Sequence, residues 1–543
     1  MAQTPYVTLN RVNLTWPDGH VLFDDVSESF DDAIVGIVGR NGSGKSTLGA
    51  LIAGDLAPTR GRVERRAAVR RVTQQVADAA DGSIAALAGL SAPLHALQRL
   101  NRGDGTRADL DCLGERWDLE SRWRQLLGRA GIEHDDDDAA SLSGGQRMLV
   151  ALLGAFCSDA DLLVLDEPGN HLDLERGALL REEIRSWRAR GRGLVLISHD
   201  RDLLARVDRI IDLRHDGLHR HGGGWDSFEH QRQLELESAQ TRLAQARHVR
   251  DRTLDALRKQ RESAERRNAR GKRERDTGSQ STLLLNIQRE RADHSDAARQ
   301  ERHARQQEEA QRQVAAAHAA LGDDLNSPVF PMLDIDLPAG QTLLTCERLI
   351  PPWGWSEPLD WVVRGPARIA IAGANGTGKS TLLRLLAGHL APRSGRCTTA
   401  HPVALLDQSL NLLDPARSLL AQLQDRAPEL GEAKARRWLA MAGIDATEAL
   451  RPSATLSGGE RLRGALLLAI GTTPAPRLLM LDEPGNHLDL AAIGALEAML
   501  RSWRGALLVA SHDRRFLDRI ALDGQLARTG SGWTFTPAAP RGD

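Results

Sequence analysis

Residues 39–47 read GRNGSGKST, and residues 373–381 repeat the pattern as GANGTGKST. An apolar segment precedes each loop (residues 33–38 and 368–372), and a segment rich in leucine and alanine follows it. Glycines between a strand and a helix allow backbone N–H groups to surround phosphate oxygens, and the positive end of the helix dipole strengthens the attraction. The sequence therefore predicts two α/β domains, each with a phosphate-binding loop.

Three further motifs follow each loop in the same order. The first copy has LSGGQ, LLVLDEP and SHD at residues 142–146, 162–168 and 198–200. The second copy has LSGGE, LLMLDEP and SHD at residues 456–460, 478–484 and 511–513. Eight motifs in one repeated order argue strongly against a chance match, so we expect the chain to bind and hydrolyse ATP.

Nucleotide binding is assigned mainly to the two loops. Lys45 and Lys379 are expected to contact the β- and γ-phosphates, because a compact ammonium fits between phosphates where a planar guanidinium does not. They are two of only five lysines among the 71 lysine and arginine residues. The other expected contacts are Gly39, Asn41, Gly42, Gly44, Ser46 and Thr47 in the first loop, and Gly373, Asn375, Gly376, Gly378, Ser380 and Thr381 in the second.

A magnesium ion is expected beside each loop. Mg²⁺ prefers oxygen ligands, and a loop hydroxyl together with a carboxylate at the end of an apolar strand supplies them. In both copies a glutamine follows another strand-like segment, from which it can approach the nucleotide, the metal and the attacking water. The expected ligands are Ser46, Gln74 and Asp166 in the first copy, and Ser380, Gln408 and Asp482 in the second.

Catalysis is assigned to a glutamate and a histidine in each copy. Glu167 and Glu483 directly follow the expected metal-binding aspartates, where they can accept a proton from the attacking water. His199 and His512 follow further apolar strands and are expected to contact the γ-phosphate.

Two tryptophans upstream of the loops are candidates for stacking on adenine. Trp16 precedes the first loop and Trp353 precedes the second. Ordinary packing is the alternative for both residues, and Trp355 competes with Trp353 for the stacking role.

Length and composition indicate a soluble protein of several domains. The 543 residues are 41% hydrophobic and 27% charged, and no apolar run approaches the roughly 20 residues of a membrane helix. No basic stretch followed by an apolar run stands at the N-terminus, and the four cysteines lie far apart without metal-ligand spacing. We therefore expect a cytoplasmic protein with reduced thiols.

Comparison of the two copies locates an insertion in the first. Lys45 and Lys379 lie 334 residues apart, whereas Ser143 and Ser457 lie 314 apart, so the first copy holds 20 extra residues between these motifs. The stretch at residues 91–127 is a mixture of polar and apolar residues, which is consistent with helices.

The segment between the copies has a different character. Residues 229–322 lack proline and are rich in arginine, glutamine, glutamate and alanine, with a broken spacing of three and four between apolar residues. Glycine and small polar residues at 268–281 are expected to interrupt the helix and form the turn of an antiparallel hairpin. Residues 242–275 contain 13 basic and five acidic residues, a net charge of +8 near the expected tip.

Both halves resemble the ATP-binding-cassette (ABC) ATPases. In that family two cassettes pair head to tail, and the LSGG motif of each covers the ATP held by the other. The residues that this resemblance assigns are Ser457, Gly458 and Gly459 at the first site, and Ser143, Gly144 and Gly145 at the second.

The segment EPGNHLDL, at residues 167–174 and 483–490, looks like the EPTNHLD of the ABC-F family. Glycine replaces the family threonine at Gly169 and Gly485, so coupling between the two sites can differ from that in the family. The family's arm insertion belongs where the first copy has its 20 extra residues, so a short or absent arm is expected.

The resemblance implies two P-loop ABC-type nucleotide-binding domains joined by a long antiparallel helical hairpin. We place the first cassette at residues 5–229, the linker at 230–322 with its tip near 260–282, and the second cassette at 323–541. The implied partners are the ribosome, through rRNA and peptidyl tRNA, with no stable membrane partner and a monomeric chain. Within that role we favour ribosome protection against antibiotics over a general translation factor; the alternatives are a transporter ATPase subunit with a separate membrane chain and a DNA-repair-type ABC ATPase.

Overall fold

The computed structural model describes residues 4–74, 82–132, 138–170, 172–275, 301–302, 304–317, 328–331, 335, 337–374, 376–486, 488–530 and 532–538. The chain divides into two compact units. Residues 1–228 and 327–543 form one unit, and residues 229–326 form the other.

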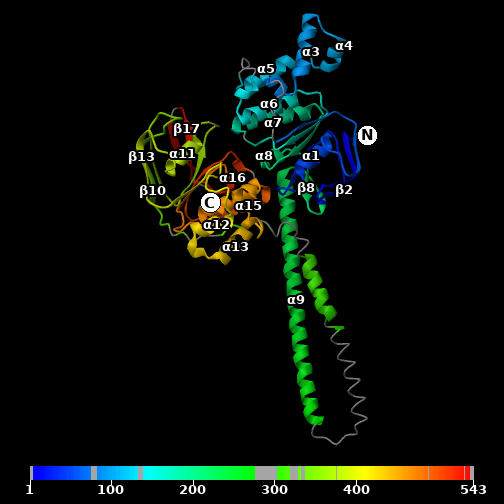
Figure 1. The fold of residues 1–543 in the computed structure, drawn as a ribbon, viewed down its shortest axis with the longest axis vertical. Coiled ribbons are helices and arrows are strands. Elements are labelled where there is room, and N and C mark those ends of the chain that lie inside the picture. Colours follow the sequence, from blue (N-terminus) through cyan, green and yellow to red (C-terminus); the bar gives the residue numbers. More distant parts are fainter. Residues whose placement is uncertain are drawn as a thin grey trace. The chain divides into compact units, whose positions relative to one another are not determined.

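The first cassette, coloured blue to green in Figure 1, is built on a six-stranded sheet. Its strand order is β5-β6-β7-β3-β8-β9. The strands from β5 to β8 are parallel, and β9 closes the edge as the antiparallel partner of β8. Leu163 and Leu165 of β6 pack with helices α6 and α7, whereas Leu162 and Val164 pack with α1. Both faces of the sheet are therefore covered, which explains why β6 and β7 are continuous apolar runs. The strands are β3 (Ile34–Gly39), β5 (Val69–Val72), β6 (Leu162–Asp166), β7 (Gly193–Ile197), β8 (Arg209–Arg214) and β9 (Gly217–Gly222).

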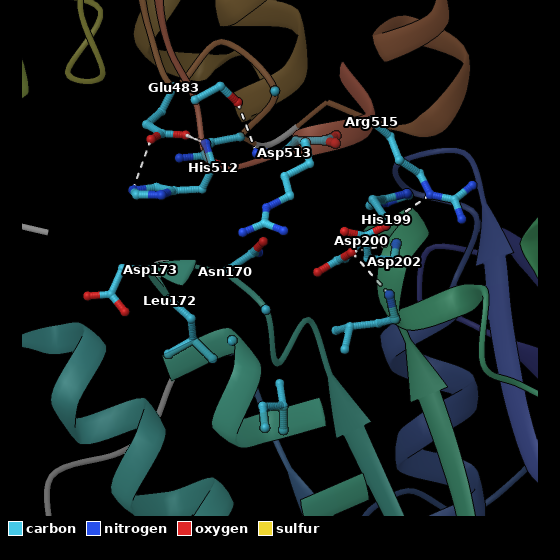
Figure 2. A pocket seen from close by; sticks show the side chains of 18 of the residues that line it. Asn170, Leu172, Asp173, His199, Asp200, Asp202, Glu483, His512, Asp513 and Arg515 are labelled. Carbon is cyan, nitrogen blue, oxygen red and sulfur yellow. Dashed lines mark hydrogen bonds and ion pairs between the residues drawn. The ribbon is translucent and has the colours of Figure 1, made fainter. Parts of the chain in front are cut away.

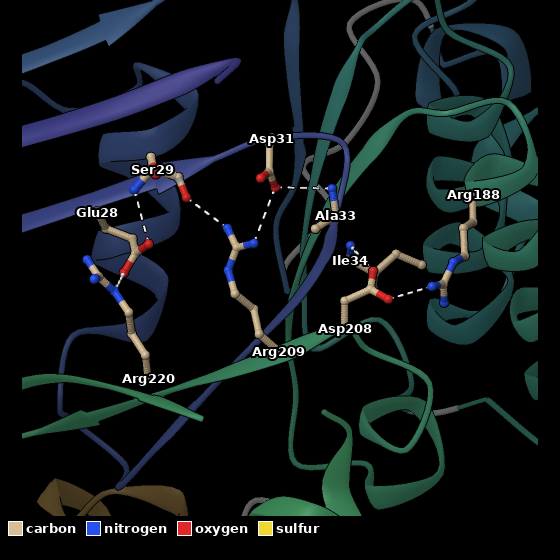
Figure 3. Close-up of polar contacts among 9 residues, drawn as sticks. All are labelled: Glu28, Ser29, Asp31, Ala33, Ile34, Arg188, Asp208, Arg209 and Arg220. Carbon is tan, nitrogen blue, oxygen red and sulfur yellow. Dashed lines mark hydrogen bonds and ion pairs between the residues drawn. The ribbon is translucent and has the colours of Figure 1, made fainter. Parts of the chain in front are cut away.

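A smaller antiparallel sheet of order β2-β1-β4 belongs to the same cassette. Its strands are β1 (Val7–Thr15), β2 (Val21–Phe30) and β4 (Arg60–Arg65). Polar contacts join it to the main sheet (Figure 3). Arg220 of β9 pairs with Glu28 of β2, and Arg209 of β8 pairs with Asp31 at 3.3 Å. Asp208 accepts a hydrogen bond from the backbone at the start of β3, which fixes the strand that leads into the first loop.

The second cassette repeats this plan. Its six-stranded sheet has the order β14-β15-β16-β12-β17-β18, and its antiparallel sheet has the order β11-β10-β13. Leu479 and Leu481 of β15 pack with α14 and α15, and Leu478 and Met480 pack with α11. The strands are β10 (Gln341–Ile350), β11 (Leu359–Gly365), β12 (Arg368–Ala372), β13 (Ser394–Thr399), β14 (Val403–Leu406), β15 (Leu478–Asp482), β16 (Ala506–Ala510), β17 (Gly524–Thr529) and β18 (Gly532–Pro537).

Helices cover the sheets and present the motifs at their N-termini. The first cassette contains α1 (Lys45–Ala53), α2 (Ile84–Leu87), α3 (Ser91–Arg102), α4 (Arg107–Leu113), α5 (Leu119–Arg129), η1 (Ala139–Ser141), α6 (Gly144–Phe156), α7 (Leu174–Ala189) and α8 (Arg201–Leu204). The second contains α11 (Lys379–Leu386), α12 (Leu419–Arg426), η3 (Pro428–Leu430), α13 (Glu432–Met441), η4 (Glu448–Leu450), η5 (Ser453–Thr455), α14 (Gly458–Ile470), α15 (Leu490–Ser502) and α16 (Arg514–Arg519).

The insertion in the first cassette is helical, as its sequence predicts. The stretch at 91–127 forms α3, α4 and most of α5. Thr106 begins α4 with a capping box in which the Asp109 carboxylate accepts from the Thr106 backbone, and Asp109 also pairs with Arg99 of α3. These contacts fold the insertion back on itself as a short helical pair.

The linker contains a long helix, α9 (Trp225–Arg275), of 51 residues and a length of about 76 Å. The predicted interruption from residue 268 is wrong up to Arg275, because the helix continues through Gly271. One glycine costs about 1 kcal/mol in a helix, too little to end a long one. Residues 301–302 and 304–317 are also helical, and Leu243 and Ala310 are buried in this unit. The expected turn at 276–281 lies outside the described residues.

The predicted fold class is confirmed: the protein is α/β, with two sheet-containing nucleotide-binding domains and a long helix in the linker. Within the described residues, none of the helices has an apolar stretch long enough to cross a membrane.

Candidate active sites at the two phosphate-binding loops

Each loop joins the central strand of its sheet to a helix that begins at the lysine. Gly44 and Gly378 precede these helices with φ of 95°, a left-handed conformation that glycine adopts without strain. Lys45 Nζ donates to the backbone oxygens of Gly39 and Arg40 at 2.9 and 2.8 Å. Lys379 makes the same contacts with Gly373 and Ala374, at 2.8 and 3.2 Å. Both ammonium groups thus lie inside their loops, where phosphate would bind.

A hydroxyl and a carboxylate meet beside each lysine. Ser46 Oγ donates to Asp166 Oδ1 at 3.1 Å, and the Ser380 hydroxyl hydrogen-bonds to Asp482. Both aspartates end buried strands. Two such oxygen groups next to a phosphate site match the ligand preference of Mg²⁺. The residues present at both loops therefore fit this metal.

A glutamate and a histidine follow in each site. Glu167 Oε1 lies 3.5 Å from His199 Nε2, and Glu483 Oε1 lies 3.3 Å from His512 Nε2. Both glutamates have left-handed backbone, with φ of 51° and 50°, which is uncommon for residues other than glycine. The backbone N–H of each donates to the end of the neighbouring strand at 2.8 Å, and this bond holds the bend. The bend aims the carboxylate into the site rather than along the strand.

Burial shifts the titration of these groups. Burial raises the pKa of Glu167 and of Glu483 to about 7. Burial and the nearby lysine lower the pKa of His199 to about 3 and that of His512 to about 4. Both histidines are therefore neutral at pH 7, and each glutamate is poised to exchange a proton near that pH.

The two cassettes approach each other at these sites. A pocket of about 990 Å³ is lined by Lys379, Glu483 and His512 of the second cassette and by Asn170 and Asp173 of the first (Figure 2). The negative charge of Asp173 raises the pKa of Lys379 and of His512 against the effect of burial. The second loop is thus exposed to the electrostatic field of the first cassette.

The reciprocal contact occurs at the first loop. Asp489 accepts a hydrogen bond from the Asn41 backbone N–H at 3.3 Å, and its charge acts on Lys45 and His199. Asp173 and Asp489 also begin α7 and α15 as N-caps, accepting from backbone N–H groups at 2.9 Å. Sequence reasoning gave these aspartates no role. Their position six residues after each glutamate in both copies was the available signal.

The LSGG motifs begin helices α6 and α14. Ser143 and Ser457 are the N-caps, and each exchanges hydrogen bonds with the residue three positions later in a capping box. The glycines that follow lie in the first turn of each helix, a favourable place for an anion. Ser143, Gly144 and Gly145 are absent from the described residues that line the pocket at the second loop. The structure brings Asp173 to that pocket but not the LSGG motif.

A residue of the first loop acts electrostatically on α14, the helix that begins with the second LSGG motif. Burial lowers the pKa of Arg463 on α14, and the positive charge of Arg40 acts in the same direction. Gly459 is buried, whereas Gly145 is only half-buried. The two LSGG motifs thus differ in their surroundings.

The remaining predicted contacts lie at or near the loops. Gln74 and Gln408 are exposed just after β5 and β14, and Gln408 lines the pocket at the second loop. Trp16 and Trp353 are 39% and 61% exposed, so both side chains are accessible, whereas Trp355 is only 5% exposed. A Cβ at Gly378 would lie 3.2 Å from the ring of Trp355, which packs under the loop. Asn375 lies outside the described residues.

The two family departures have unequal surroundings. A Cβ at Gly169 would lie 3.2 Å from Asp200 Oδ2 and 3.4 Å from Leu203, whereas one at Gly485 would have no neighbour within 4 Å. The first glycine is therefore confined, and the second is not.

A buried ion pair joins the cassettes. Arg201 of α8 and Glu497 of α15 are almost fully buried, and Arg201 Nη1 lies 2.5 Å from Glu497 Oε1. The repeat places Arg514 at the position of Arg201, two residues after the histidine, and Arg181 at the position of Glu497, eight residues after the N-cap aspartate. Both of these arginines line the pocket at the second loop. An attractive pair on one side thus corresponds to two like charges on the other.

Known proteins resemble this chain over most of its length. The profile of the ABC transporter family matches residues 24–170 and 357–486, which is half of the chain. The probable ATP-binding protein YheS of Escherichia coli O6:H1 is 32% identical over 521 residues, covering 92% of this chain and 75% of that protein. The ABC transporter F family member 4 of Arabidopsis thaliana is 28% identical over 519 residues, covering 90% and 68%.

The chain belongs to the ABC-F family. It is an ABC-type ATP hydrolase with two ATP-binding cassettes. A further ABC-F relative, the energy-dependent translational throttle protein EttA of Mycobacterium tuberculosis, is 28% identical over 553 residues, covering 96% of this chain and 90% of EttA. The archaeal ribosome recycling factor aABCE1, solved with the ribosomal stalk protein aP1, shares the fold, with a TM-score of 0.56 over 97% of this chain and 89% of its own at 18% identity.

Proposed function

We propose that this ABC-F ATPase binds the ribosome in its ATP-bound form, contacts peptidyl tRNA and rRNA through the tip of the linker, and leaves after ATP hydrolysis. The carrying observation is α9, an uninterrupted helix of 51 residues whose last 34 residues contain 13 basic and five acidic side chains. Positive charge gathered on a long helix suits the phosphate backbone of RNA. EttA is a translational throttle protein and aABCE1 is a ribosome recycling factor, and these roles support the same partner.

ATP would control this binding by joining the cassettes. Asp173 and Asp489 each act electrostatically on the loop lysine of the opposite cassette. A nucleotide held between such surfaces binds the closed arrangement more tightly, and only this difference in affinity can shift the equilibrium. In that closed form the LSGG motifs are proposed to cover the phosphates, with Mg²⁺ held by the serine and aspartate of each site.

Within each site, the roles follow the chemistry. Mg²⁺ supplies charge neutralisation at the phosphates when it is bound. Glu167 and Glu483 are proposed to accept a proton from the attacking water, which their raised pKa favours. The neutral His199 and His512, within 3.5 Å of these carboxylates, would orient the γ-phosphate and the water.

The ribosome proposal is tested by the double variant Glu167→Gln with Glu483→Gln. It should keep ATP binding, lose turnover and cosediment with ribosomes in ATP. Incubation with DNA under the same conditions tests the DNA-repair alternative, and membrane fractionation of cells tests the transporter alternative. A variant that binds ATP yet sediments free of ribosomes would overturn the proposal.

The tip is tested by equal losses of charge at two places on α9. Replacing Arg270, Lys272 and Arg273 with glutamine should weaken cosedimentation most at low salt, since phosphate contacts act through counterion release. The control replaces three exposed arginines nearer the start of α9, which are Arg242, Arg247 and Arg252. Equal weakening by both sets would remove the tip from the proposal and leave only a general charge effect.

Ribosome protection is the specific form that we favour. Among the residues that the structure describes, the insertion of the first cassette forms the short pair α3 and α4. ABC-F resistance proteins resemble this chain in a small arm with a long linker. Expression in a susceptible host should raise tolerance to drugs of the peptidyl transferase centre, and the double glutamine variant should remove it. Intact ribosome binding without any change in tolerance would favour a general translation factor.

A further inference from the structure

At the first site a guanidinium donates a hydrogen bond to the carboxylate that is proposed to bind the metal. Arg71 of β5 donates from Nη2 to Asp166 Oδ2 at 3.2 Å and to the Ser46 backbone oxygen at 3.0 Å. Its Nη1 donates to Asp55 Oδ2 at 3.1 Å. The side chain of Arg71 is 13% exposed and that of Asp166 is 3% exposed, so water screens their contact poorly.

The second site has a different residue at this position. Lys45 and Lys379 lie 334 residues apart, as do Gln74 and Gln408, and the same spacing matches Arg71 with Leu405. Leu405 is a buried core residue of β14. It carries no charge and no hydrogen-bond donor toward Asp482. The strand beside the metal-binding strand thus presents a cation in one cassette and a hydrocarbon in the other.

This difference bears directly on the metal. Asp166 accepts from Ser46 through Oδ1 and from Arg71 through Oδ2, so both of its oxygens have partners before any cation arrives. A guanidinium directly opposes a divalent cation, because it uses the same lone pairs and adds a positive charge at hydrogen-bond distance. At the second site the serine hydroxyl donates to Asp482, as in the first, but β14 offers no guanidinium. The positive charge of Arg384 on α11 also acts on Asp482, but its guanidinium pairs with Asp407, at 3.8 Å.

We propose that Arg71 competes with Mg²⁺ for Asp166, so that the first ATP site holds its metal more weakly than the second. Arg71 is a positioning residue, since it acts on the metal through Asp166 and does not reach the phosphates. The two sites then differ in the Mg²⁺ concentration at which they fill. This inference rests on the proposed metal ligands and is independent of the ribosome as partner.

The test measures metal binding at one site at a time in the full-length chain. Lys379→Ala disables the second loop and leaves the first site; Lys45→Ala leaves the second. Mn²⁺ is titrated by electron paramagnetic resonance in the presence of a non-hydrolysable ATP analogue. We expect the dissociation constant of Mn²⁺ at the first site to exceed that at the second by about tenfold, the size of one charge-assisted hydrogen bond.

Arg71→Leu copies the second site into the first. In the Lys379→Ala chain it should strengthen Mn²⁺ binding by about tenfold, to the value of the second site. Arg71→Met, which fills the space of the arginine stem, should act alike and guards against collapse of the strand. Leu405→Met in the Lys45→Ala chain is the matched packing control and should change nothing.

Two results would overturn the proposal. Equal Mn²⁺ affinities at the two sites, unchanged by Arg71→Leu, would show that Arg71 moves away from Asp166 when nucleotide binds. Weaker Mn²⁺ binding in both Arg71 variants would show that the guanidinium supports the carboxylate for the metal. If Mn²⁺ bound at neither site, the metal ligands themselves would be wrongly assigned, a failure distinct from both.

Discussion

The first and second ATP sites contain the same reactive groups in different electrostatic surroundings. Both have the loop lysine, the serine–aspartate contact and the bent glutamate next to a neutral histidine. Around these groups the cassettes differ. Arg71 of the first cassette is replaced by Leu405 at the equivalent position of the second, and the buried pair of Arg201 and Glu497 is matched by two arginines, Arg514 and Arg181.

This difference teaches that duplication preserved the chemistry while the supporting residues diverged. A site keeps its reaction if the few groups that touch phosphate and water persist, whereas neighbouring positions are free to alter metal affinity or the contact between cassettes.

The largest effect is expected from the glutamates. Glu167→Gln with Glu483→Gln should lower ATP turnover by at least about a hundredfold, because the proton acceptor is lost at both sites. At limiting Mg²⁺ the single change Glu483→Gln should lower turnover more than Glu167→Gln, since the second site fills first. Phosphate release measured over a series of Mg²⁺ concentrations checks this. Equal losses at every concentration would make the sites equivalent.

The buried ion pair should matter more than its counterpart. Glu497→Gln leaves the Arg201 guanidinium buried without its charge partner, at a cost of about 3–5 kcal/mol. The thermal unfolding midpoint should therefore fall by more than about 5 °C. Arg181→Gln, at the same position of the other cassette, should leave the midpoint unchanged or raise it. A similar fall in both variants would contradict the asymmetry.

The pH dependence should be shared by the sites. Burial raises the pKa of both glutamates to about 7, and only the charged carboxylate can accept a proton. The rate should therefore fall about tenfold per unit as pH drops below 7 and level off above it. Glu167→Gln leaves only the second site active and Glu483→Gln only the first, so their pH profiles should superimpose. Midpoints more than one unit apart would extend the asymmetry to the catalytic base.

The smallest effect concerns the two glycines. Gly169→Thr would press its new side chain against Asp200 and Leu203 and should cost about 1 kcal/mol, seen as a fall of a few degrees in the unfolding midpoint. Gly485→Thr has open space and should leave the midpoint within about 1 °C. Thermal melts of the two purified variants compare them directly. An equal fall in the midpoint would mean that the loss of glycine from the loop backbone, and not contact with neighbouring side chains, causes the destabilisation.

Much of this molecule follows from its sequence, because each motif combines local backbone and chemistry. The loops, the strands ending in Asp166 and Asp482, and the ABC-F family were all predicted, and the fold class and the family are confirmed. The roles of the site residues remain predictions. The break expected at residue 268 was wrong, because a single glycine costs too little to end a helix of 51 residues.

The contacts of Arg71 were beyond sequence reasoning for a physical reason. Residues 71 and 166 are neighbours only because β5 pairs with β6 in the sheet, and strand order cannot be read from local spacing. The crossing of Asp173 and Asp489 to the opposite loop likewise depends on how two separate domains meet.

Asp173 and Asp489 carry a consequence of their own, because each also caps a helix of its own cassette. Any change at the opposite loop that moves such a carboxylate should loosen its hold on the first amides of α7 or α15, and by reciprocity fraying of that helix end should alter the opposite site. Amide hydrogen exchange in the first turn of α7 is therefore expected to report occupancy of the second loop, and exchange in α15 occupancy of the first. Each cassette would then register, in the fraying of one helix end, the nucleotide that the other cassette holds.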